Sequence, residues 1–364
     1  MDISVYRTGE LNGTDRAAWS TVQSQAHLLG TPQLANPFLA PEFALAVGRC
    51  RRGVRIAVIR EDGEPAAFLP FQRSALGVGR AIGLGVSDAQ GLVHRPGFQW
   101  DPRELLRACG LAVLEFDHLV EGQKPFETAS LRSFPSPVVD VDQGFDAYMA
   151  RLREQSPKFI RRTLTKGRKL GRDIGPVRYV HDERDPVMLR RLLDWKSAQY
   201  RRTGRSDRFA HPWIVQLVNQ LFHTRTASFA GQLSVLYAGE QPVAAHFGIR
   251  SERVLCCWFP AYDPAYAKFS PGLTLHLHMA EGAAADGLAY VDLGRGEKQY
   301  KDCLKTRELT VSEGWVARRH PVALGHRAHR VPVRALRNTV VSRPELFEPA
   351  DRLLKRMGRI RSGG

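Results

Sequence analysis

The sequence predicts an α/β protein with a mixed sheet, built from two halves of similar design. The length, the composition and a faint internal repeat support this prediction. At 364 residues the chain exceeds the usual size of one domain, so we expect two domains of about 150 to 200 residues. Hydrophobic residues make up 43% and charged residues 25%, which is the composition of a globular protein.

The repeat consists of two hairpins, each preceded by a helix. An apolar strand at 54–58 is followed by a turn and a return strand at 63–68, and the same order recurs at 233–237 and 239–246. Each preceding helix begins with a proline, which is favoured in the first helical turn because its missing N–H loses no partner there. These prolines are Pro41 and Pro212. The pattern predicts a duplicated helix-then-hairpin unit.

We expect one domain at 1–140, a second at 141–320 and a basic tail at 321–364. The second begins with a helical stretch that runs into dense basic sequence, including Arg161 and Arg162. Two interpretations of this run stay open: a solvated helix face, or a clamp for a phosphate-bearing or acidic substrate. For the tail, the alternatives are a loosely docked end or contact with an anionic membrane.

Composition also restricts the class of protein. No apolar run approaches the roughly 20 residues of a membrane-spanning helix, and the N-terminus lacks the pattern of a signal peptide, so we expect a cytoplasmic protein that at most touches the inner membrane face. The five cysteines form no CxxC pair, which argues against a disulfide framework and a metal site. The net charge of +16 favours an anionic partner, unless it reflects only an arginine-rich composition.

Residues 231–301 are expected to fold as three strands, a helix and a further strand. The helix begins at Ser270, Pro271 and Gly272. Ser270 can cap it, and a helix start directly after a strand presents N–H groups and a positive dipole end to an anion. The sequence therefore predicts a place for a cofactor pyrophosphate, with an ordinary helix start as the alternative.

Polar residues collect where the last of these strands ends. The strand runs from Tyr290 to Leu293, and ligands commonly bind at strand exits in α/β sheets. The polar side chains expected at this exit are those of Asp292, Arg295, Glu297, Tyr300 and Lys301. The alternative is an ion-pair network on a surface loop. His246, inside an apolar stretch, is either a hydrogen-bonded core residue or a proton acceptor.

These motifs resemble a known family. The run Trp258–Pro264, the helix start at Ser270 and the motif Asp292–Lys301 are similar to the CelD-type acetyltransferases of the GNAT superfamily, which are relatives of the FemAB aminoacyl transferases. The similarity is strongest over 145–310, and 20–130 resembles a degenerate first half. The resemblance implies a tandem GNAT-like fold that transfers an acyl group from acetyl-CoA or another acyl-CoA to an amine or hydroxyl. Acceptors in the family are often sugars or saccharide precursors of the envelope.

The resemblance also implies roles for the residues. Lys268, Ser270, Gly272 and Leu273 stand where the family binds the donor. Arg295 and Lys301 would hold a phosphate or carboxylate of the acceptor, with further substrate contacts from Arg161, Arg162, Tyr262 and Asp263. For acyl transfer, Glu297, Asp292 or His246 is the expected base and Tyr300 the expected acid. A cysteine nucleophile is not expected, because Cys256 and Cys257 lie within an apolar strand.

Two other functions remain as alternatives. A FemAB-like transferase that uses aminoacyl-tRNA would explain the positive charge, although the long helical hairpin of typical FemAB enzymes is not evident. A noncatalytic module that binds a polymer is the other. Replacement of Asp292 or Glu297 separates it from an enzyme, because only an enzyme loses function while it stays folded.

Overall fold

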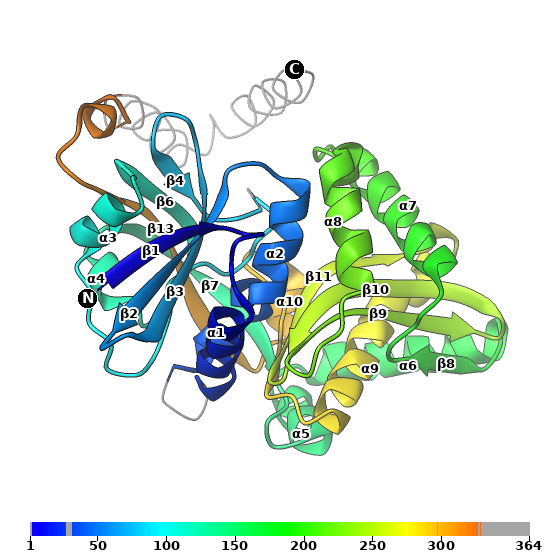
Figure 1. Ribbon diagram of the computed structural model, residues 1–364. Helices are drawn as coiled ribbons and strands as arrows, with labels where there is room; N and C mark the ends of the chain where they lie inside the picture. The colour runs from blue at the N-terminus through cyan, green and yellow to red at the C-terminus, as the bar shows by residue number, and fades with distance from the viewer. Residues whose placement is uncertain (1, 27–30, 84, 297, 327, 329–364) are drawn as a thin grey trace.

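The computed structural model describes residues 2–26, 31–83, 85–296, 298–326 and 328. Their strands form one 13-stranded mixed sheet, in the order β1-β2-β3-β4-β6-β13-β7-β12-β11-β10-β9-β8, with β5 (Val93–His94) beside β3. Figure 1 shows the first half in blue and cyan and the second in green and yellow, with the sheet continuing between them. The expected α/β fold class with a mixed sheet is confirmed.

The two halves repeat the same strand arrangement. In the first half the strands are β1 (Asp2–Arg7), β2 (Val54–Glu61), β3 (Glu64–Arg73), β4 (Val78–Arg80) and β6 (Val113–Val120). In the second half they are β8 (Val177–Val180), β9 (Phe229–Ala238), β10 (Gln241–Ser251), β11 (Val254–Tyr262) and β12 (Tyr290–Asp292). In both halves the first three pairings are antiparallel and the last is parallel. The predicted hairpin repeat corresponds to β2–β3 and β9–β10.

The two halves exchange their last strands. The strand that follows the first half in the chain pairs with the second half, and the strand that follows the second half pairs with the first. β7 (Ser130–Asp140) pairs with β12, and β13 (Arg307–Ala317) pairs with β6. β7 and β13 also pair with each other. The boundary expected at residue 140 falls at the end of β7. Because the strands are exchanged, the two halves share a continuous backbone hydrogen-bond network.

Helices from both halves pack together on one side of the sheet. These are α1 (Gly13–Gln25) and α2 (Pro41–Cys50) from the first half, and α7 (Pro186–Arg202) and α8 (Pro212–Phe222) from the second. α2 and α8 begin at the two prolines of the repeat and contact each other, with the Arg51 guanidinium 5.0 Å from the ring centre of Trp213. The apolar core on this side is shared by the two halves.

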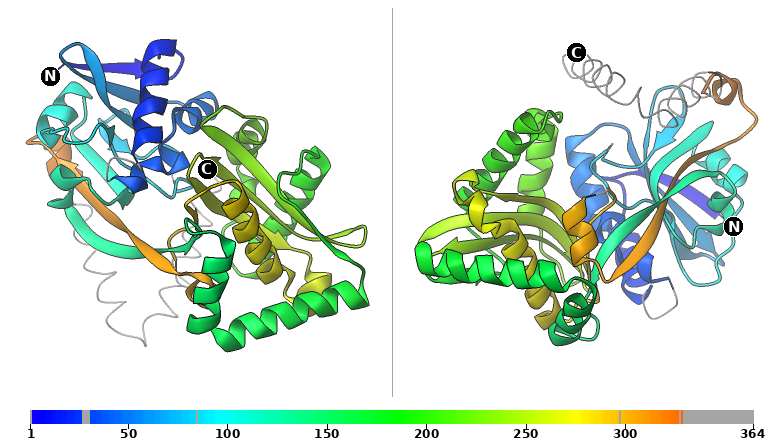
Figure 2. Two further views of the ribbon diagram at one scale, coloured as in Figure 1. Left: turned by 90° about the horizontal axis from the view of Figure 1, so that it is seen from below. Right: turned by 180° about the vertical axis from the view of Figure 1, so that it is seen from behind.

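The opposite side of the second half is covered by α5 (Phe145–Gln155), α6 (Pro157–Asp173) and α9 (Pro271–Ala285). Figure 2 shows α6 and α9 crossing on this side, away from α7 and α8. The short α10 (Gln299–Leu304) lies near the junction of the halves, and α3 (Pro102–Ala108) and α4 (Lys124–Glu127) belong to the first half. The start of α9 is therefore close to both the sheet and the basic helix α6.

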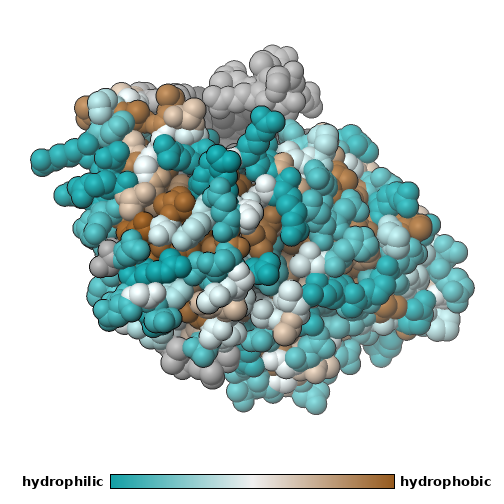
Figure 3. All heavy atoms as spheres, viewed as in Figure 1, coloured by the Kyte–Doolittle hydropathy of each residue, from teal (hydrophilic) through white to brown (hydrophobic). Residues whose placement is uncertain are grey.

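No helix in the described ranges is long and apolar enough to span a bilayer. Figure 3 shows polar side chains over most of the second half on this face, whereas apolar surface gathers over the first half. The expected tail at 321–364 lies outside the described residues, except for 321–326 and 328.

Candidate functional site

The central feature of the second half is a place where two neighbouring strands diverge. β11 and β12 run parallel and pair at three positions, the last of which joins Cys256 to Asp292. β12 ends there, and the chain turns away at Gly294, which has a φ of 71°. β11 continues to Tyr262 without a strand partner on this side in the described part of the chain. The result is an opening between the two strands.

A β-bulge lies at the point of divergence. The register between β10 and β11 shifts between Phe247 and Ile249, so that Cys257 and Trp258 together face the single residue Gly248. A Cβ at Gly248 would lie 2.1 Å from the carbonyl oxygen of Cys256, so only glycine fits. Bulges bend a strand and redirect its side chains, and they are frequent beside active sites. The bulge therefore bends β11 at the point where it leaves β12.

The start of α9 lies next to this opening and is not capped by a side chain. Ser270 adopts the left-handed conformation with φ 52° and ψ 51°. Its hydroxyl does not cap the helix, contrary to the expectation from the sequence, and instead accepts a hydrogen bond from Lys166 Nζ at 2.8 Å. Uncapped N–H groups and the dipole favour an anion, and Lys166 adds a positive charge. A Cβ at Gly272 would lie 3.5 Å from the Tyr262 ring, which is an ordinary contact, so the packing there does not require glycine.

The other residues predicted on the donor side are near this helix start but make different contacts. Leu273 is half-buried in the first turn of α9. Lys268 is exposed, with Nζ 4.9 Å from the ring centre of Phe269. Asp263 accepts a hydrogen bond from the backbone N–H of Ala265 and so begins the short helix at 264–269. That contact is a turn-forming one.

Asp292 is buried, and its carboxylate is bound by other groups of the protein. Its carboxylate accepts hydrogen bonds from Asn36 Nδ2 at 3.2 Å, Ser136 Oγ at 3.0 Å and the backbone N–H of Gly294 at 2.8 Å. Burial is the main cause that raises its pKa. With its oxygens occupied, this carboxylate holds the turn after β12 in place.

The residues after Asp292 also hold this turn and line its inner side. Arg295 lies over the Phe134 ring and donates to the carbonyl oxygen of Asp117 and to Glu313. The ammonium of Lys301 is buried and donates to the carbonyl oxygen of Gly294 at 2.7 Å. Glu297 lies outside the described residues. The turn that follows β12 is thus fixed by both cations that were predicted to hold substrate.

Tyr300 connects this turn to α9. Its ring stacks on His276, in the second turn of α9, with 5.4 Å between the ring centres. The structure therefore brings part of the 292–301 motif next to the N-terminal end of α9, on the same side of the sheet. Burial raises the pKa of the Tyr300 phenol, so that it carries its proton at neutral pH.

His246 is fully buried beneath α9. Neither ring nitrogen makes a hydrogen bond of good geometry within the described residues, and the backbone of Cys256 has only a small, opposing effect on the pKa. Burial, with smaller effects from His276 and Lys196, lowers its pKa to about 3. The ring is therefore neutral at physiological pH, and a catalytic role requires a path for protons through the interior.

Three cations at the junction of the halves were not predicted from the sequence as site residues. Lys196, on α7, is 8% exposed and donates to the carbonyl oxygen of Pro260, on the free part of β11, at 2.7 Å. Burial, together with the charges of Lys298 and Arg205, lowers its pKa to about 7. We call Lys196, Arg205 and Lys298 the cationic cluster. No motif in the sequence indicates that these three side chains lie close together.

The cysteines near the opening are poor nucleophiles. Burial raises the pKa of Cys257 to about 12 and that of Cys256 well above its ordinary value. Both are therefore protonated at neutral pH, and the thiolate is the reactive form. Among the described residues no group of histidine, cysteine and carboxylate side chains could hold a metal ion. Arg161 and Arg162 lie exposed on α6.

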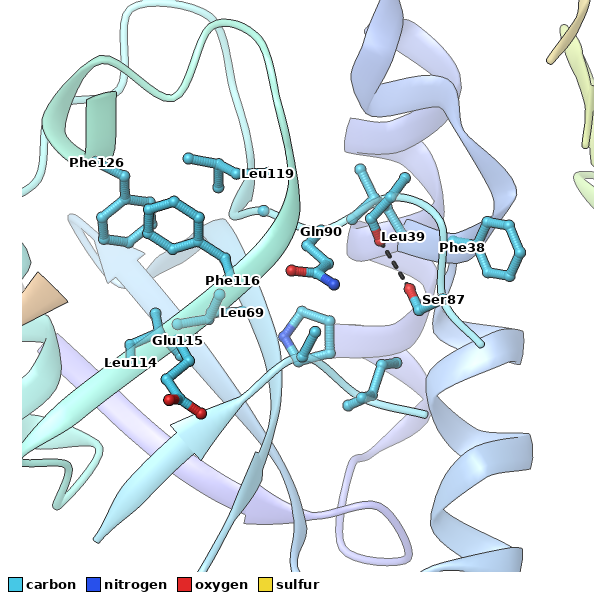
Figure 4. Close-up of a pocket in the computed structure, with 15 residues that line it drawn as sticks. Phe38, Leu39, Leu69, Ser87, Gln90, Leu114, Glu115, Phe116, Leu119 and Phe126 are labelled. Carbon is cyan, nitrogen blue, oxygen red and sulfur yellow. Dashed lines mark hydrogen bonds between the residues drawn. The ribbon is translucent and has the colours of Figure 1, made fainter. Parts of the chain in front are cut away.

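The first half has an equivalent opening, but it is filled. β4 and β6 are parallel and pair at three positions, as β11 and β12 do. Beyond them the chain returns, and Gln90 takes the place of β4 beside β6 through a parallel bridge to Leu119. Figure 4 shows the remaining cavity, with Gln90 and Ser87 between Phe38 and Phe116. Its volume is about 30 Å³, so it has space for little more than a water molecule.

Comparison with known proteins gives a family match within the second half. Residues 158–302 match the family model described as an acetyltransferase (GNAT) domain. Comparison with curated proteins gives no significant match. Among solved structures the chain is similar to FemX, with 10% identity, coverage of 86% of this chain and 96% of that chain, and a TM-score of 0.56.

Two further structures align over most of the chain. One is a conserved protein of unknown function from Bacteroides thetaiotaomicron, with 9% identity, coverage of 86% and 100%, and a TM-score of 0.53. The other is a tandem GNAT protein from the clavulanic acid biosynthesis pathway, with 10% identity, coverage of 87% and 98%, and a TM-score of 0.46. At these identities the likeness to FemX and to the Bacteroides thetaiotaomicron protein concerns the fold alone, and the CelD-type subfamily stays a prediction. The family match covers residues 158–302, within the second half of the chain.

Proposed function

We propose that the protein is a GNAT-type acyltransferase that moves an acyl group, in the simplest case acetyl, from acyl-CoA to an amine or hydroxyl of a sugar. The acceptor class we favour is a precursor of an envelope polysaccharide or exopolysaccharide, as in the CelD-type proteins that the sequence resembles. The observation that carries the proposal is the opening between β11 and β12 beside the uncapped start of α9.

The donor would occupy this opening. Its amide-containing arm can lie along the free edge of β11, where backbone groups are available for hydrogen bonds. Its pyrophosphate would lie at the start of α9, near Ser270, Gly272 and the ammonium of Lys166. Backbone N–H groups on β11 are suited to stabilise the negative charge that develops on the thioester oxygen.

The acceptor would bind at the junction of the halves. The cationic cluster of Lys196, Arg205 and Lys298 favours an acceptor that carries phosphate or carboxylate. The side chains of Arg205 and Lys298 have no hydrogen-bond or ion-pair partner among the described residues, although Lys298 Nζ lies 5.8 Å from the ring centre of Tyr300. Lys196 uses one of its three N–H groups. Arg295 and Lys301 would act indirectly, because their contacts hold the turn after β12.

Proton transfer completes the reaction. Tyr300 is the candidate acid for the leaving thiolate, because its phenol carries a proton at neutral pH; the raised pKa also makes it a weaker acid than an ordinary phenol. Glu297 stays a candidate base by its position in the motif, whereas the contacts of Asp292 and the burial of His246 favour structural roles for both. The high pKa of Cys257 supports direct transfer without an acylated enzyme.

A second candidate function is aminoacyl transfer from a charged tRNA. The fold similarity to FemX and the basic surface of α6, with Arg161 and Arg162 exposed, favour it. In this version α6 would bind the nucleic acid backbone. Both functions place the protein on the cytoplasmic side, where their donors are found, and peripheral contact of the basic tail with an anionic membrane is compatible with both.

Ligand binding and transfer assays test the proposal and separate the two donors. Thermal unfolding is measured with acetyl-CoA, a longer acyl-CoA and charged tRNA, because a ligand that binds only the folded state raises the melting temperature. Thiol release from acetyl-CoA is then followed with glucosamine, glucosamine 6-phosphate and a uridine diphosphate amino sugar. We expect stabilisation by acyl-CoA and fastest release with a phosphorylated acceptor. Stabilisation and turnover with charged tRNA alone would replace the first function by the second.

A further inference from the structure

The loop that fills the opening of the first half also reaches the working opening of the second. It spans 85–91, and its C-terminal end is hydrogen-bonded to β6 of the first half. Gln90 donates its backbone N–H to the carbonyl oxygen of His118 and accepts from the N–H of Val120, which fixes the loop to β6. The Ser87 hydroxyl donates to the carbonyl oxygen of Ala89, an interaction drawn in Figure 4. The loop is therefore held in a defined shape.

The same loop is bound directly to the second half. The indole N–H of Trp258, at the bulge of β11, donates to the carbonyl oxygen of Val86 at 2.9 Å. The guanidinium of Arg208 donates to the carbonyl oxygen of Gly85. The loop thus docks on β11 at the place where β11 leaves β12.

Asp88 is the acidic side chain that this loop places against the end of β12. A Cβ built on Gly294 would lie 3.4 Å from Asp88 Oδ2, so the carboxylate lies against the turn that follows β12. Asp88 is half-buried and has no hydrogen-bond or ion-pair partner within the described ranges. Its carboxylate is free to accept a proton, unlike that of Asp292, whose oxygens are occupied.

We propose that Asp88, contributed by the first half, is the general base that takes the proton from the acceptor, so that the catalytic site is formed by both halves. This inference rests on the proposed acyltransferase function and deepens it. The first half would then have lost its own donor opening, and the loop that closed it would supply a catalytic residue to the second.

The electrostatic surroundings of Asp88 are suited to this role. Burial raises the pKa of its carboxyl above the ordinary value near 3.8, and nearby cations limit the rise. The ionisable groups that face it from the neighbouring elements are Asp117 and His118 on β6, Tyr200 on α7, Arg208, Cys256 on β11, Asp292 on β12 and Lys301 on α10. A carboxylate with a raised pKa is a stronger base at neutral pH than an ordinary one.

The transfer step balances in atoms and charge. The neutral amine or hydroxyl of the acceptor attacks the thioester carbon, and Asp88 takes its proton as the new C–N or C–O bond forms. The C–S bond breaks and the electron pair leaves with sulfur, which is protonated by Tyr300 or by solvent. Asp88 then releases its proton to solvent, and Tyr300, where it was the donor, takes one up, so the sum is acyl-CoA plus acceptor giving acylated acceptor plus CoA thiol.

The test compares Asp88→Asn with a charge-matched control. Glu61→Gln removes one negative charge from an exposed position at the end of β2 in the same half. Thiol release from acetyl-CoA is measured across pH with the amino-sugar acceptor that gives the highest wild-type rate. We expect Asp88→Asn to lower kcat by about 100- to 10,000-fold and to remove the acidic limb of the kcat/KM profile. Its KM for acetyl-CoA, its melting temperature and the activity of Glu61→Gln should remain close to wild type.

The possible outcomes separate this inference from the proposed function. An Asp88→Asn variant that turns over at the wild-type rate, or that keeps the acidic limb, would overturn the role of Asp88 while the transferase remains. A loss that appears only as a lower melting temperature would also overturn it. Absence of thiol release by the wild type with every acceptor would overturn the proposed function and this inference with it.

Discussion

The side-chain amide of Asn36 donates a hydrogen bond to the buried carboxylate of Asp292 at 3.2 Å. Asn36 belongs to the first half, and Asp292 ends the strand that borders the opening of the second. The same amide side chain accepts from the backbone N–H of Phe38, so it cannot turn without losing a partner. This contact couples the packing of the halves to the geometry of the proposed site.

Replacement of Asp292 by alanine should destabilise the protein as well as impair activity. The change leaves Asn36, Ser136 and the N–H of Gly294 without their acceptor, and each buried unsatisfied group costs about 1–3 kcal/mol. Urea unfolding measures the loss. Asp101→Ala, at the exposed start of α3, is the control and should cost only about 1 kcal/mol.

A double-mutant cycle with Asn36→Ala isolates the contact between the halves. We expect a coupling energy of about 0.5–3 kcal/mol between Asn36 and Asp292, as is usual for residues in one hydrogen-bond network. Additive effects of the two changes would show that the contact does not couple the halves.

Lys196 should make stability depend on pH. Its pKa is about 7 in the folded protein and near 10.4 when unfolded, so the unfolded chain binds more protons between these values. The free energy of unfolding should therefore rise with pH from about 7 to 10 because of this group. Lys196→Met removes this rise, which chemical denaturation at several pH values can detect. Parallel pH profiles for the two proteins would show that the ammonium is not destabilised by burial.

Lys166 should contribute to donor binding. Lys166→Ala removes the ammonium beside Ser270 at the start of α9, and loss of one charge near a phosphate should weaken acetyl-CoA binding several-fold. Titration calorimetry at low and high salt measures the effect, which should shrink as salt screens the charge. Lys169→Ala, exposed on the same helix, is the matched control. Equal losses in both variants would point to general attraction by α6.

Gly248→Ala should disrupt the bulge of β11. The new Cβ would lie 2.1 Å from the carbonyl oxygen of Cys256, and crowding of this kind typically costs about 1–3 kcal/mol. Gly13→Ala, on α1 with no atom within 4 Å of the new Cβ, should instead be neutral or stabilise by up to about 1 kcal/mol. Urea unfolding compares them. A wild-type free energy of unfolding for Gly248→Ala would argue against the bulge geometry.

Local patterns in the sequence predicted much of the fold. The prolines at 41 and 212 mark the starts of α2 and α8, and the apolar runs after them form the hairpins β2–β3 and β9–β10. Such signals lie within a few residues of each other. The exchange of β7 and β13 between the halves was not predicted, because it depends on pairings between strands far apart in the chain, such as Val311 with Phe134.

The candidate site was predicted less completely than the fold. The start of α9 and the turn after β12 were found because each is a short motif. Lys196 and Asp88 were not singled out, since each reaches the site from a distant segment and neither lies in a motif. Lys166 lies in the basic run that was interpreted as either a solvated helix face or a phosphate clamp, but it was not named there as a site residue. The role of Ser270 also differed, because the sequence favours a cap while the left-handed backbone turns the hydroxyl toward Lys166.

A crystal structure with bound acetyl-CoA tests most directly whether the opening between β11 and β12 binds the donor. We predict the thioester arm along β11 between Cys257 and Tyr262, with the pyrophosphate at the backbone of Pro271 and Gly272. Acetyl-CoA bound beside β4 and β6, or on a surface away from both openings, would contradict the account.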